Sequence, residues 1–488
     1  MKYHNPVIKG FYPDPSVCFA NGKYYLASSS FQYFPGVPLF ESDDLVNWTP
    51  IGFALTRPEQ VMLDKINSSG GVFAPTIRYN DGRFYLVTTN DTTHENFYVW
   101  TDDIYGEWSD PITVDQSGID PSLLFDGGRV YFLSNGEDDS GVIGIVQCEI
   151  DITTGRKLTE SRCIWQGTGG RFLESPHMYH INDSYYLMAA EGGTEYGHMI
   201  TYARSDSPWG TFESYAKNPV LTNRNKAPYI IQGIGHGDMI QDKSGNWHIL
   251  CLGFRQMDKW MPFHHLGREV FLVPVRFMED GWFKAGTHGT CDEYYDIEGD
   301  FEQNEKRTFT FENTLWNVDW QFLRKPVPEN YIFDKNKLIL KGTDITLDNT
   351  DSPTFICMHQ RDFLFKLRVS VKTDRGEAGI SLYHCEQEHY DIAVRKTETG
   401  FEAVLRLNIG GVKHEQTKAY LGDGAVNITV AADHFGYVFM VNGFMIGTAD
   451  AKYLSSEVCG GFTGTVIGLY ATGGNTAEFT DFEVDYDS

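Results

Sequence analysis

The chain has 488 residues, which is too many for one ordinary hydrophobic core, so two domains are expected. Its formal net charge of −26 would repel phosphate backbones and anionic lipid surfaces, which argues against nucleic-acid and membrane partners. A neutral substrate meets no such repulsion. Aromatic residues make up 14% of the chain, and their faces suit sugar rings as well as a protein core.

The sequence also bears on location. No apolar stretch approaches the roughly 18 residues that a membrane helix requires. The first residues, Met1 to Pro6, lack the charged-then-apolar pattern of a signal peptide. The eight cysteines are scattered without a CxxC pair or a Cys/His metal spacing, which indicates reduced thiols. We therefore expect a cytoplasmic protein, and a homo-oligomer is compatible with this composition.

In chain order, short runs rich in Val, Ile, Tyr and Phe recur between turn residues, which predicts β-strands rather than helices. Five tight hairpins are predicted, with turns at Asn21-Gly22, Asp81-Gly82, Gly127-Gly128, Asn182-Asp183 and Ser244-Gly245-Asn246. Each follows a related segment: Asp14-Pro15-Ser16-Val17, Ala74-Pro75-Thr76-Ile77, Asp120-Pro121-Ser122-Leu123, Ser175-Pro176-His177-Met178 and Gly237-Asp238-Met239-Ile240. Five such repeats of about 50 residues predict a five-bladed β-propeller over residues 1–300.

The pattern changes after this repeat. Residues 307–488 contain many short strand-like runs, such as Phe363 to Val371 and Val426 to Val430, without the blade motif. Even spacing of short strands predicts a β-sandwich of the jelly-roll, lectin-like type. The predicted fold class is therefore all-β, with a propeller followed by a sandwich.

Acidic residues stand at the start of the innermost strand of three predicted blades. They are Asp14 in blade one, Asp120 in blade three and Glu174 in blade four, whereas blade two has Ala74. Taken singly, each acid is explained by a turn or a solvated loop. Because innermost strands crowd around the central channel, their repeat register places all three acids at one mouth.

Three carboxylates in one pocket cannot all ionise at low cost, because neighbouring like charges push their pKa values apart. Inverting glycoside hydrolysis uses such a separation. One carboxylate activates water and one protonated carboxyl donates to the leaving oxygen. The two carboxyl groups lie roughly 6.5–9.5 Å apart, which leaves room for that water. The acids therefore predict a glycoside hydrolase.

Several segments carry a family resemblance: Gly10-Phe11-Tyr12-Pro13-Asp14-Pro15-Ser16, Gly71-Val72-Phe73-Ala74-Pro75, Gly118-Ile119-Asp120-Pro121-Ser122, Glu174-Ser175-Pro176-His177, Ala190-Glu191-Gly192-Gly193-Thr194 and Gly235-His236-Gly237-Asp238. With them the chain resembles glycoside hydrolase family 43, in its β-xylosidase/α-L-arabinofuranosidase branch. The segment Gly460-Gly461-Phe462-Thr463-Gly464 resembles the C-terminal sandwich domain of that branch.

The resemblance implies roles for five residues. Asp14 is expected as the general base, Glu174 as the general acid, and Asp120 as the carboxylate that tunes and orients the acid. Arg268 is expected to contact sugar hydroxyls and the central carboxylates. His236 matches a channel histidine that binds a substrate-linked water or a central Ca²⁺; calcium prefers oxygen ligands, so water would hold most of such an ion. No cofactor is otherwise expected.

Further residues match positions that line the sugar subsite. They are Phe31, Phe73 and Thr194, and Phe73 departs from the family pattern because close relatives usually have Trp there. Phe462 is the candidate for a sandwich-domain Phe that closes the pocket. Glu191 is expected to be structural.

The predicted function is an exo-acting, inverting hydrolase that releases pentose from the non-reducing ends of xylo-oligosaccharides or arabinoxylo-oligosaccharides. The expected terminal sugar is β-1,4-linked xylose. The enzyme is also expected to release α-L-arabinofuranose residues. A dedicated α-L-arabinofuranosidase is the alternative within the class, and an endo-acting arabinanase fits the fold. From another class, a non-catalytic carbohydrate-binding protein fits the architecture, although binding alone needs no such set of acids.

Overall fold

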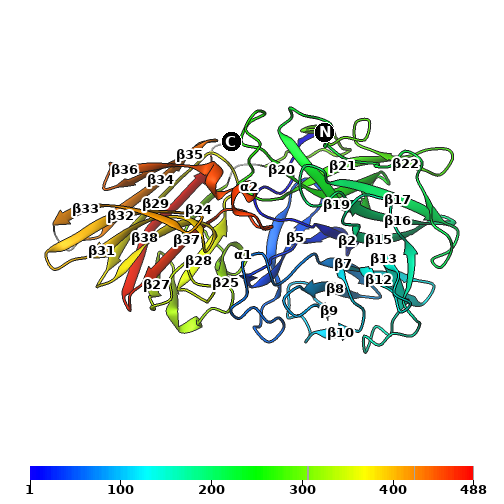
Figure 1. Ribbon diagram of the computed structural model, residues 1–488, viewed down its shortest axis with the longest axis horizontal. Coiled ribbons are helices and arrows are strands. Elements are labelled where there is room, and N and C mark those ends of the chain that lie inside the picture. Colours follow the sequence, from blue (N-terminus) through cyan, green and yellow to red (C-terminus); the bar gives the residue numbers. More distant parts are fainter. Residues whose placement is uncertain (305–306, 422–423, 487–488) are drawn as a thin grey trace.

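The computed structural model describes all residues except 305–306, 422–423 and 487–488. The chain is nearly all β and forms two parts side by side, a propeller and a sandwich (Figure 1). Within the described residues, the two α-helices are single turns, α1 (Trp316–Asp319) and α2 (Ser456–Cys459), and the two 3₁₀ turns are η1 (Pro328–Asn330) and η2 (Ala451–Leu454). The predicted fold class is confirmed.

The propeller consists of five four-stranded antiparallel sheets. Blades one and two contain β2 (Ser16–Ala20), β3 (Lys23–Ala27), β5 (Gly36–Ser42) and β6 (Thr49–Leu55), then β7 (Thr76–Asn80), β8 (Arg83–Asn90), β9 (Glu95–Thr101) and β10 (Ile112–Val114). Blades three and four contain β11 (Ile119–Asp126), β12 (Arg129–Glu137), β13 (Ile143–Glu149) and β14 (Arg162–Trp165), then β15 (Glu174–Ile181), β16 (Ser184–Glu191), β17 (Met199–Ser205) and β18 (Glu213–Ser214). Blade five contains β19 (Ile231–Gln241), β20 (Trp247–Arg255), β21 (Glu269–Phe277) and β22 (Phe283–Ala285).

The five predicted hairpins join the first two strands of each blade. In blade one, Ala20 pairs with Lys23, so Asn21 and Gly22 form the whole turn, with φ values of 51° and 85°. This is the backbone that favours Asn-Gly, because both central residues of such a turn need a positive φ. The hairpin predictions are therefore confirmed.

The ring of blades is closed by the N-terminal segment. Strand β1 (Lys2–His4) pairs with β23 (Tyr294–Asp296), and Asn5 donates from Nδ2 to the carbonyl oxygen of Leu272 over 3.0 Å. The start of the chain is thus fastened to blade five. Closure of this kind holds the inner strands at fixed distances around the channel.

A buried ion pair fills the channel below its mouth. Arg78 Nη1 lies 2.7 Å from Oδ2 of the fully buried Asp238. The same carboxylate accepts hydrogen bonds from Ser16 Oγ at 2.7 Å and from the Tyr179 hydroxyl at 2.6 Å. Because these four residues come from blades one, two, four and five, the pair ties the blades together.

The sandwich consists of two sheets of eight strands each. One contains β26 (Tyr331–Asp334), β27 (Lys337–Lys341), β38 (Thr476–Tyr486), β29 (Phe365–Thr373), β34 (Val426–Ala432), β35 (Gly436–Val441) and β36 (Phe444–Asp450), with β24 (Thr308–Thr310) beside β38. The other contains β33 (Val412–Leu421), β32 (Gly400–Ile409), β31 (Glu388–Lys396), β30 (Glu377–Cys385), β37 (Val466–Thr472), β28 (Phe355–His359), β25 (Gln321–Leu323) and β4 (Tyr33–Phe34).

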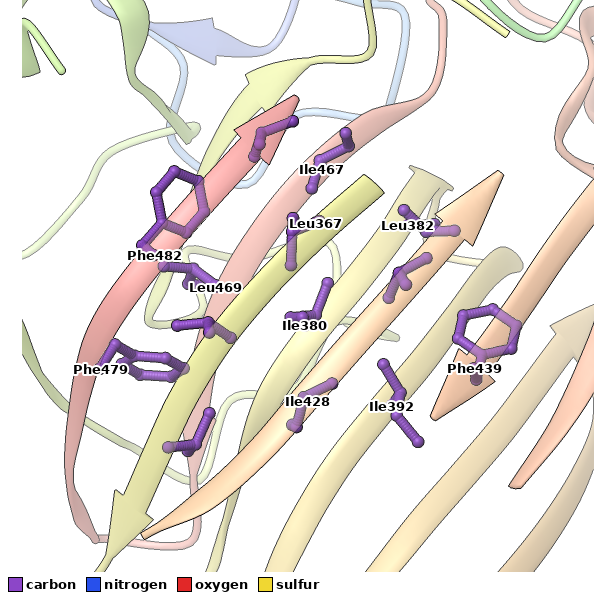
Figure 2. Packing of buried hydrophobic residues seen from close by; sticks show 14 of the residues in the cluster. Leu367, Ile380, Leu382, Ile392, Ile428, Phe439, Ile467, Leu469, Phe479 and Phe482 are labelled. Atoms are coloured by element: carbon purple, nitrogen blue, oxygen red, sulfur yellow. The ribbon is translucent and has the colours of Figure 1, made fainter. Parts of the chain in front are cut away.

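The core of the sandwich lies between these sheets. Figure 2 shows Leu367 and Phe439 of one sheet facing Ile380, Ile392 and Leu469 of the other. Alternate residues of each strand point inward, as the period of two in a strand requires. Burying each such side chain contributes about 1.5–3 kcal/mol.

Strand β4 belongs to the blade-one segment but pairs with the sandwich. Phe34 lies opposite Phe322 and Tyr33 opposite Leu323. Phe11 also packs with Tyr33 in a core cluster shared with sandwich residues such as Phe355. The second sheet of the sandwich therefore continues into the propeller, and the sandwich is fixed beside the channel mouth.

None of the described helices is both long and apolar enough to cross a membrane. All eight cysteines are free thiols.

Candidate active site

The inner strands begin at the channel mouth with a shared backbone distortion. Asp14, Asp120, Ser175 and His236 occupy equivalent positions and have φ values of 56°, 54°, 58° and 41°. In blade five this is one residue before Gly237, where the predicted segment began. A left-handed conformation costs such residues about 1–3 kcal/mol, and it persists where the surroundings impose it. The ladder register shifts at the same place in blades three, four and five. This repeated bulge turns the side chains of the mouth toward the pocket.

One pocket of about 400 Å³ lies at this mouth, between the propeller and the sandwich. All nine predicted site residues line it: Asp14, Phe31, Phe73, Asp120, Glu174, Thr194, His236, Arg268 and Phe462. The volume lies within the range of small-molecule sites.

Asp14 is buried and held by charged and polar neighbours. It accepts a short hydrogen bond from Ser29 Oγ, and Arg268 Nη1 donates to its Oδ1 over 3.1 Å. Burial alone would raise its pKa, but the positive charge of Arg268 and the Ser29 hydrogen bond outweigh burial, so the pKa of Asp14 is lowered. The carboxylate is therefore ionised and can accept a proton.

Asp120 and Glu174 form a pair with the opposite behaviour. Burial and the neighbouring Glu174 raise the pKa of Asp120 well above its ordinary value. Burial and the charge of Asp14 raise the pKa of Glu174 to about 7. The backbone N–H of Ser175 donates to Asp120 Oδ2 over 3.0 Å, which fixes the two carboxyls relative to each other. The pair thus binds a proton at neutral pH.

His236 lies between the acids, with Nδ1 3.5 Å from Asp14 Oδ1 and 3.9 Å from Asp120 Oδ2. Burial lowers its pKa, so the ring is neutral at pH 7. No three His, Cys, Asp or Glu side chains in the described part of the chain are arranged to hold a metal. A Ca²⁺ ion near His236, held mostly by water, stays a prediction.

Three aromatic rings form one wall of the pocket. The ring centroid of Phe31 lies 5.4 Å from that of Phe73 and 6.1 Å from that of Phe462. Phe462 comes from the sandwich, and its carbonyl oxygen accepts a hydrogen bond from Arg268 Nη2 over 3.1 Å. Arg268 Nη1 also donates to Thr194 Oγ1 over 2.8 Å. One guanidinium therefore joins Asp14, Thr194 and the sandwich.

Sequence comparison agrees with this geometry. Residues 3–283 match the profile of Glycosyl hydrolases family 43, and residues 308–486 match the Beta xylosidase C-terminal Concanavalin A-like domain. The chain belongs to glycoside hydrolase family 43. It is thus a glycosidase, as predicted from the acids.

Relatives of this family 43 enzyme align along nearly its whole length. It is 37% identical to a non-reducing end alpha-L-arabinofuranosidase of Bacteroides ovatus, over 99% of this chain and 94% of the relative. It is 33% identical to a xylosidase/arabinosidase of Butyrivibrio fibrisolvens, over 99% of both chains. Among solved structures, Bacteroides ovatus xyloglucan PUL GH43B superposes with a TM-score of 0.92 at 36% identity, over 100% of both chains.

Sequence reasoning missed several pocket residues of this family 43 enzyme. His198 and Tyr196 follow Thr194 on the same loop, and their nearness to a matched motif was the available signal. Glu457 of α2 accepts two hydrogen bonds from His264. One comes from the backbone N–H, and the other comes from Nδ1 over 2.6 Å. This contact joins the two domains, and no local sequence pattern predicts it.

Glu191 does not line the pocket. It is fully buried, and its carboxylate accepts hydrogen bonds from the loop that leads to Glu174. The expected structural role agrees with these contacts.

Proposed function

We propose that this enzyme is an exo-acting, inverting glycosidase that releases pentose from the non-reducing ends of xylo-oligosaccharides. The proposed bonds cleaved are those that attach terminal β-1,4-linked xylose or α-L-arabinofuranose residues to the rest of the substrate. One observation carries the proposal. An ionised carboxylate, Asp14, shares a pocket with a carboxyl pair, Asp120 and Glu174, that retains a proton at neutral pH.

The chemistry then runs in a single displacement. Asp14 removes a proton from a water molecule, whose oxygen attacks the anomeric carbon from the face opposite the leaving group. The C–O bond to the leaving sugar breaks, and Glu174 donates its proton to the departing oxygen. Asp120 takes the place beside Glu174 that orients the acid and tunes its pKa.

Arg268 supports both halves of this reaction. Its charge keeps Asp14 ionised before the attack, as the direction of the pKa shift indicates. Its bond to Thr194 aligns two polar groups that can contact sugar hydroxyls. The apolar faces of Phe31 and Phe73 would pack on the ring and exclude water.

The exo mode is supported by what covers the mouth. Phe462 and Glu457, both from the sandwich, line the same pocket as the three acids. A wall on that side leaves room for the end of a chain rather than its middle. This favours an exo-acting enzyme over an endo-acting arabinanase.

A dedicated α-L-arabinofuranosidase is the second candidate. Phe73 occupies a position where close relatives in family 43 usually have the larger Trp. The smaller ring alters the wall of the sugar subsite. The 37% identical Bacteroides ovatus relative is a non-reducing end alpha-L-arabinofuranosidase. The Bacillus halodurans xylan beta-1,4-xylosidase structure, by comparison, is 27% identical and superposes with a TM-score of 0.89 over 99% of this chain and 100% of that one.

The test is product analysis on xylo-oligosaccharides beside arabinoxylan fragments. Single pentoses should appear from the first time point, with chains shortened one residue at a time. Chromogenic xylosides and arabinofuranosides assayed in parallel separate the two candidates. An Asp14→Asn protein purified identically controls for contaminating glycosidases. Early release of xylobiose or longer fragments would contradict the exo mode, and binding without any hydrolysis would indicate a carbohydrate-binding protein.

We also propose a cytoplasmic location. The eight free thiols support a reducing compartment, where disulfides are rare. Cell fractionation with an antibody against the native protein tests this.

A further inference from the structure

We infer that the loop of residues 167–173 forms the binding site for the leaving sugar, with Phe172 as the surface on which that sugar lies. The inference rests on the proposed function, because it identifies the leaving group as a second sugar. It assigns a role to residues 167–173, which have no role in the acid and base chemistry proposed above. Three observations on this loop carry it.

The first observation is the exposure of Phe172. Its side chain lines the catalytic pocket and yet is 57% exposed. Because this ring lines the pocket, its exposed face is available to a ligand that enters the mouth. Sugar rings present apolar faces that suit such a ring.

The second observation is its place beside the acid. Phe172 lies two residues before Glu174, whose carboxyl must reach the oxygen that joins the two sugars. The departing sugar therefore begins at Glu174 and extends toward the mouth. A ring that is both next to Glu174 and exposed at the mouth lies along that path.

The third observation is that the loop is held in place. Glu191 Oε1 accepts hydrogen bonds from the backbone N–H of Thr168 and of Gly170, each over 3.0 Å. Its Oε2 accepts from Thr168 Oγ1 and Thr201 Oγ1, each over 2.7 Å. A buried carboxylate with four donors fixes the loop against strand β17. A side chain added at Gly167 would meet Oε1 of Glu191 at 2.7 Å, so this close approach requires glycine.

The tip of the loop is also constrained. Phe172 has a φ of 53°, which is costly for a bulky residue and persists only where contacts impose it. Arg171 forms an ion pair with Glu195 and accepts, at its carbonyl oxygen, the N–H of Gly192 over 2.8 Å. A Cβ at Gly193 would lie 3.0 Å from the Phe172 ring, so glycine at this position lets the ring approach the backbone closely. A surface fixed in advance loses little entropy on binding.

The test compares two substrates that both need the general acid but differ in the leaving group. Xylobiose carries a leaving sugar, whereas methyl β-xyloside releases methanol and has no second ring. Phe172→Ala should lower kcat/KM on xylobiose by about tenfold, mainly through KM, since it removes binding and not chemistry. On methyl β-xyloside the kcat/KM of the variant should stay within about twofold of the wild-type value on that same substrate.

Two variants make this result specific. Phe172→Tyr keeps the aromatic face and should restore the xylobiose rate. Phe444→Ala removes a ring on β36 of the sandwich that is 59% exposed. This variant should have the wild-type kcat/KM on both substrates. A thermal melt of each variant checks folding, which substitution of so exposed a side chain should not disturb.

Equal losses on both substrates, or no loss on xylobiose, would overturn the inference. The first outcome would mean that Phe172 acts through Glu174, and the second that the leaving sugar lies elsewhere. If the wild-type enzyme hydrolyses neither xyloside nor the matching arabinofuranosides, the proposed function fails, and the inference with it. The wild-type rates alone distinguish a failure of the proposed function from a failure of this inference.

Glu191→Gln tests the anchor as a positioning residue. The amide cannot accept all four hydrogen bonds, so the loop should loosen and KM for xylobiose should rise. Methyl β-xyloside again serves as the reference substrate. A fall in kcat on both substrates, with KM unchanged, would assign Glu191 to the acid rather than to the loop.

Discussion

Arg268 Nη1 lies 3.1 Å from Asp14 Oδ1, and both side chains are buried. Of the three acids proposed for catalysis, Asp14 alone has a lowered pKa and contacts this positive charge, while Asp120 and Glu174 have raised values. The distribution of charge at the mouth therefore separates a proton acceptor from a proton donor.

Replacement of the base tests this separation directly. Asp14→Asn should keep the fold and lower kcat on xylobiose by about 10²–10⁴-fold, the usual contribution of a general base. Asp81→Asn, at an exposed hairpin turn that also suits Asn-Gly, is the matched control and should retain full activity. An Asp14→Asn enzyme with more than half the wild-type rate would remove Asp14 from this role.

The acid is tested by the leaving group. A sugar alkoxide is a poor leaving group and needs a proton, whereas a nitrophenolate departs almost unaided. Glu174→Ala should therefore lower kcat/KM on xylobiose far more than on a nitrophenyl pentoside. The two rates are measured with the same enzyme preparation, and equal losses would contradict the assignment.

The pH profile follows from the two pKa directions. Glu174 must be protonated, and its pKa is raised to about 7, so kcat/KM on xylobiose should fall above about pH 7, tenfold per unit. Asp14 must be ionised, and its pKa is lowered, so activity should persist on the acid side to below the ordinary range of an aspartate. In Glu174→Ala assayed on a nitrophenyl pentoside, the alkaline fall should disappear. If it remains unchanged, another group is the acid.

The stereochemistry follows from attack by water rather than by a carboxylate. The first product from a β-xyloside should be α-xylose. Proton NMR of a fresh digest, read before mutarotation, shows the anomer directly. Initial release of β-xylose would mean a covalent intermediate, and Asp14 could not then be the base.

The buried pair below the pocket should matter for stability. Asp238→Ala leaves the Arg78 charge without its buried partner, which should cost about 3–5 kcal/mol of unfolding free energy. Asp43→Ala breaks the exposed pair with Lys243, 3.7 Å apart, and should cost less than about 1 kcal/mol. Denaturant unfolding of the three proteins compares the two losses. Similar losses would mean that the Arg78–Asp238 pair does not hold the blades together.

Much of the fold could be predicted because its signals are local. The pair Asn21-Gly22 specifies a hairpin through its own φ preferences, and five copies of the pattern give the number of blades. The same repeat register places Asp14 and Asp120 at one mouth before any contact is known. Glu174 comes just before the Ser-Pro pair of its blade, so the register places it near the same mouth, and the family resemblance adds its role.

What the sequence by itself determined is thus the propeller, the sandwich and the acids at the channel mouth. The tertiary structure alone decided what depends on contacts between distant parts of the chain. Arg268 reaches Asp14 across 254 positions, and Phe462 reaches the pocket because β4 pairs with β25 and fixes the sandwich there. The charge states depend on burial and on those neighbours, and no local pattern encodes either, because desolvation and Coulomb interactions follow distances in space.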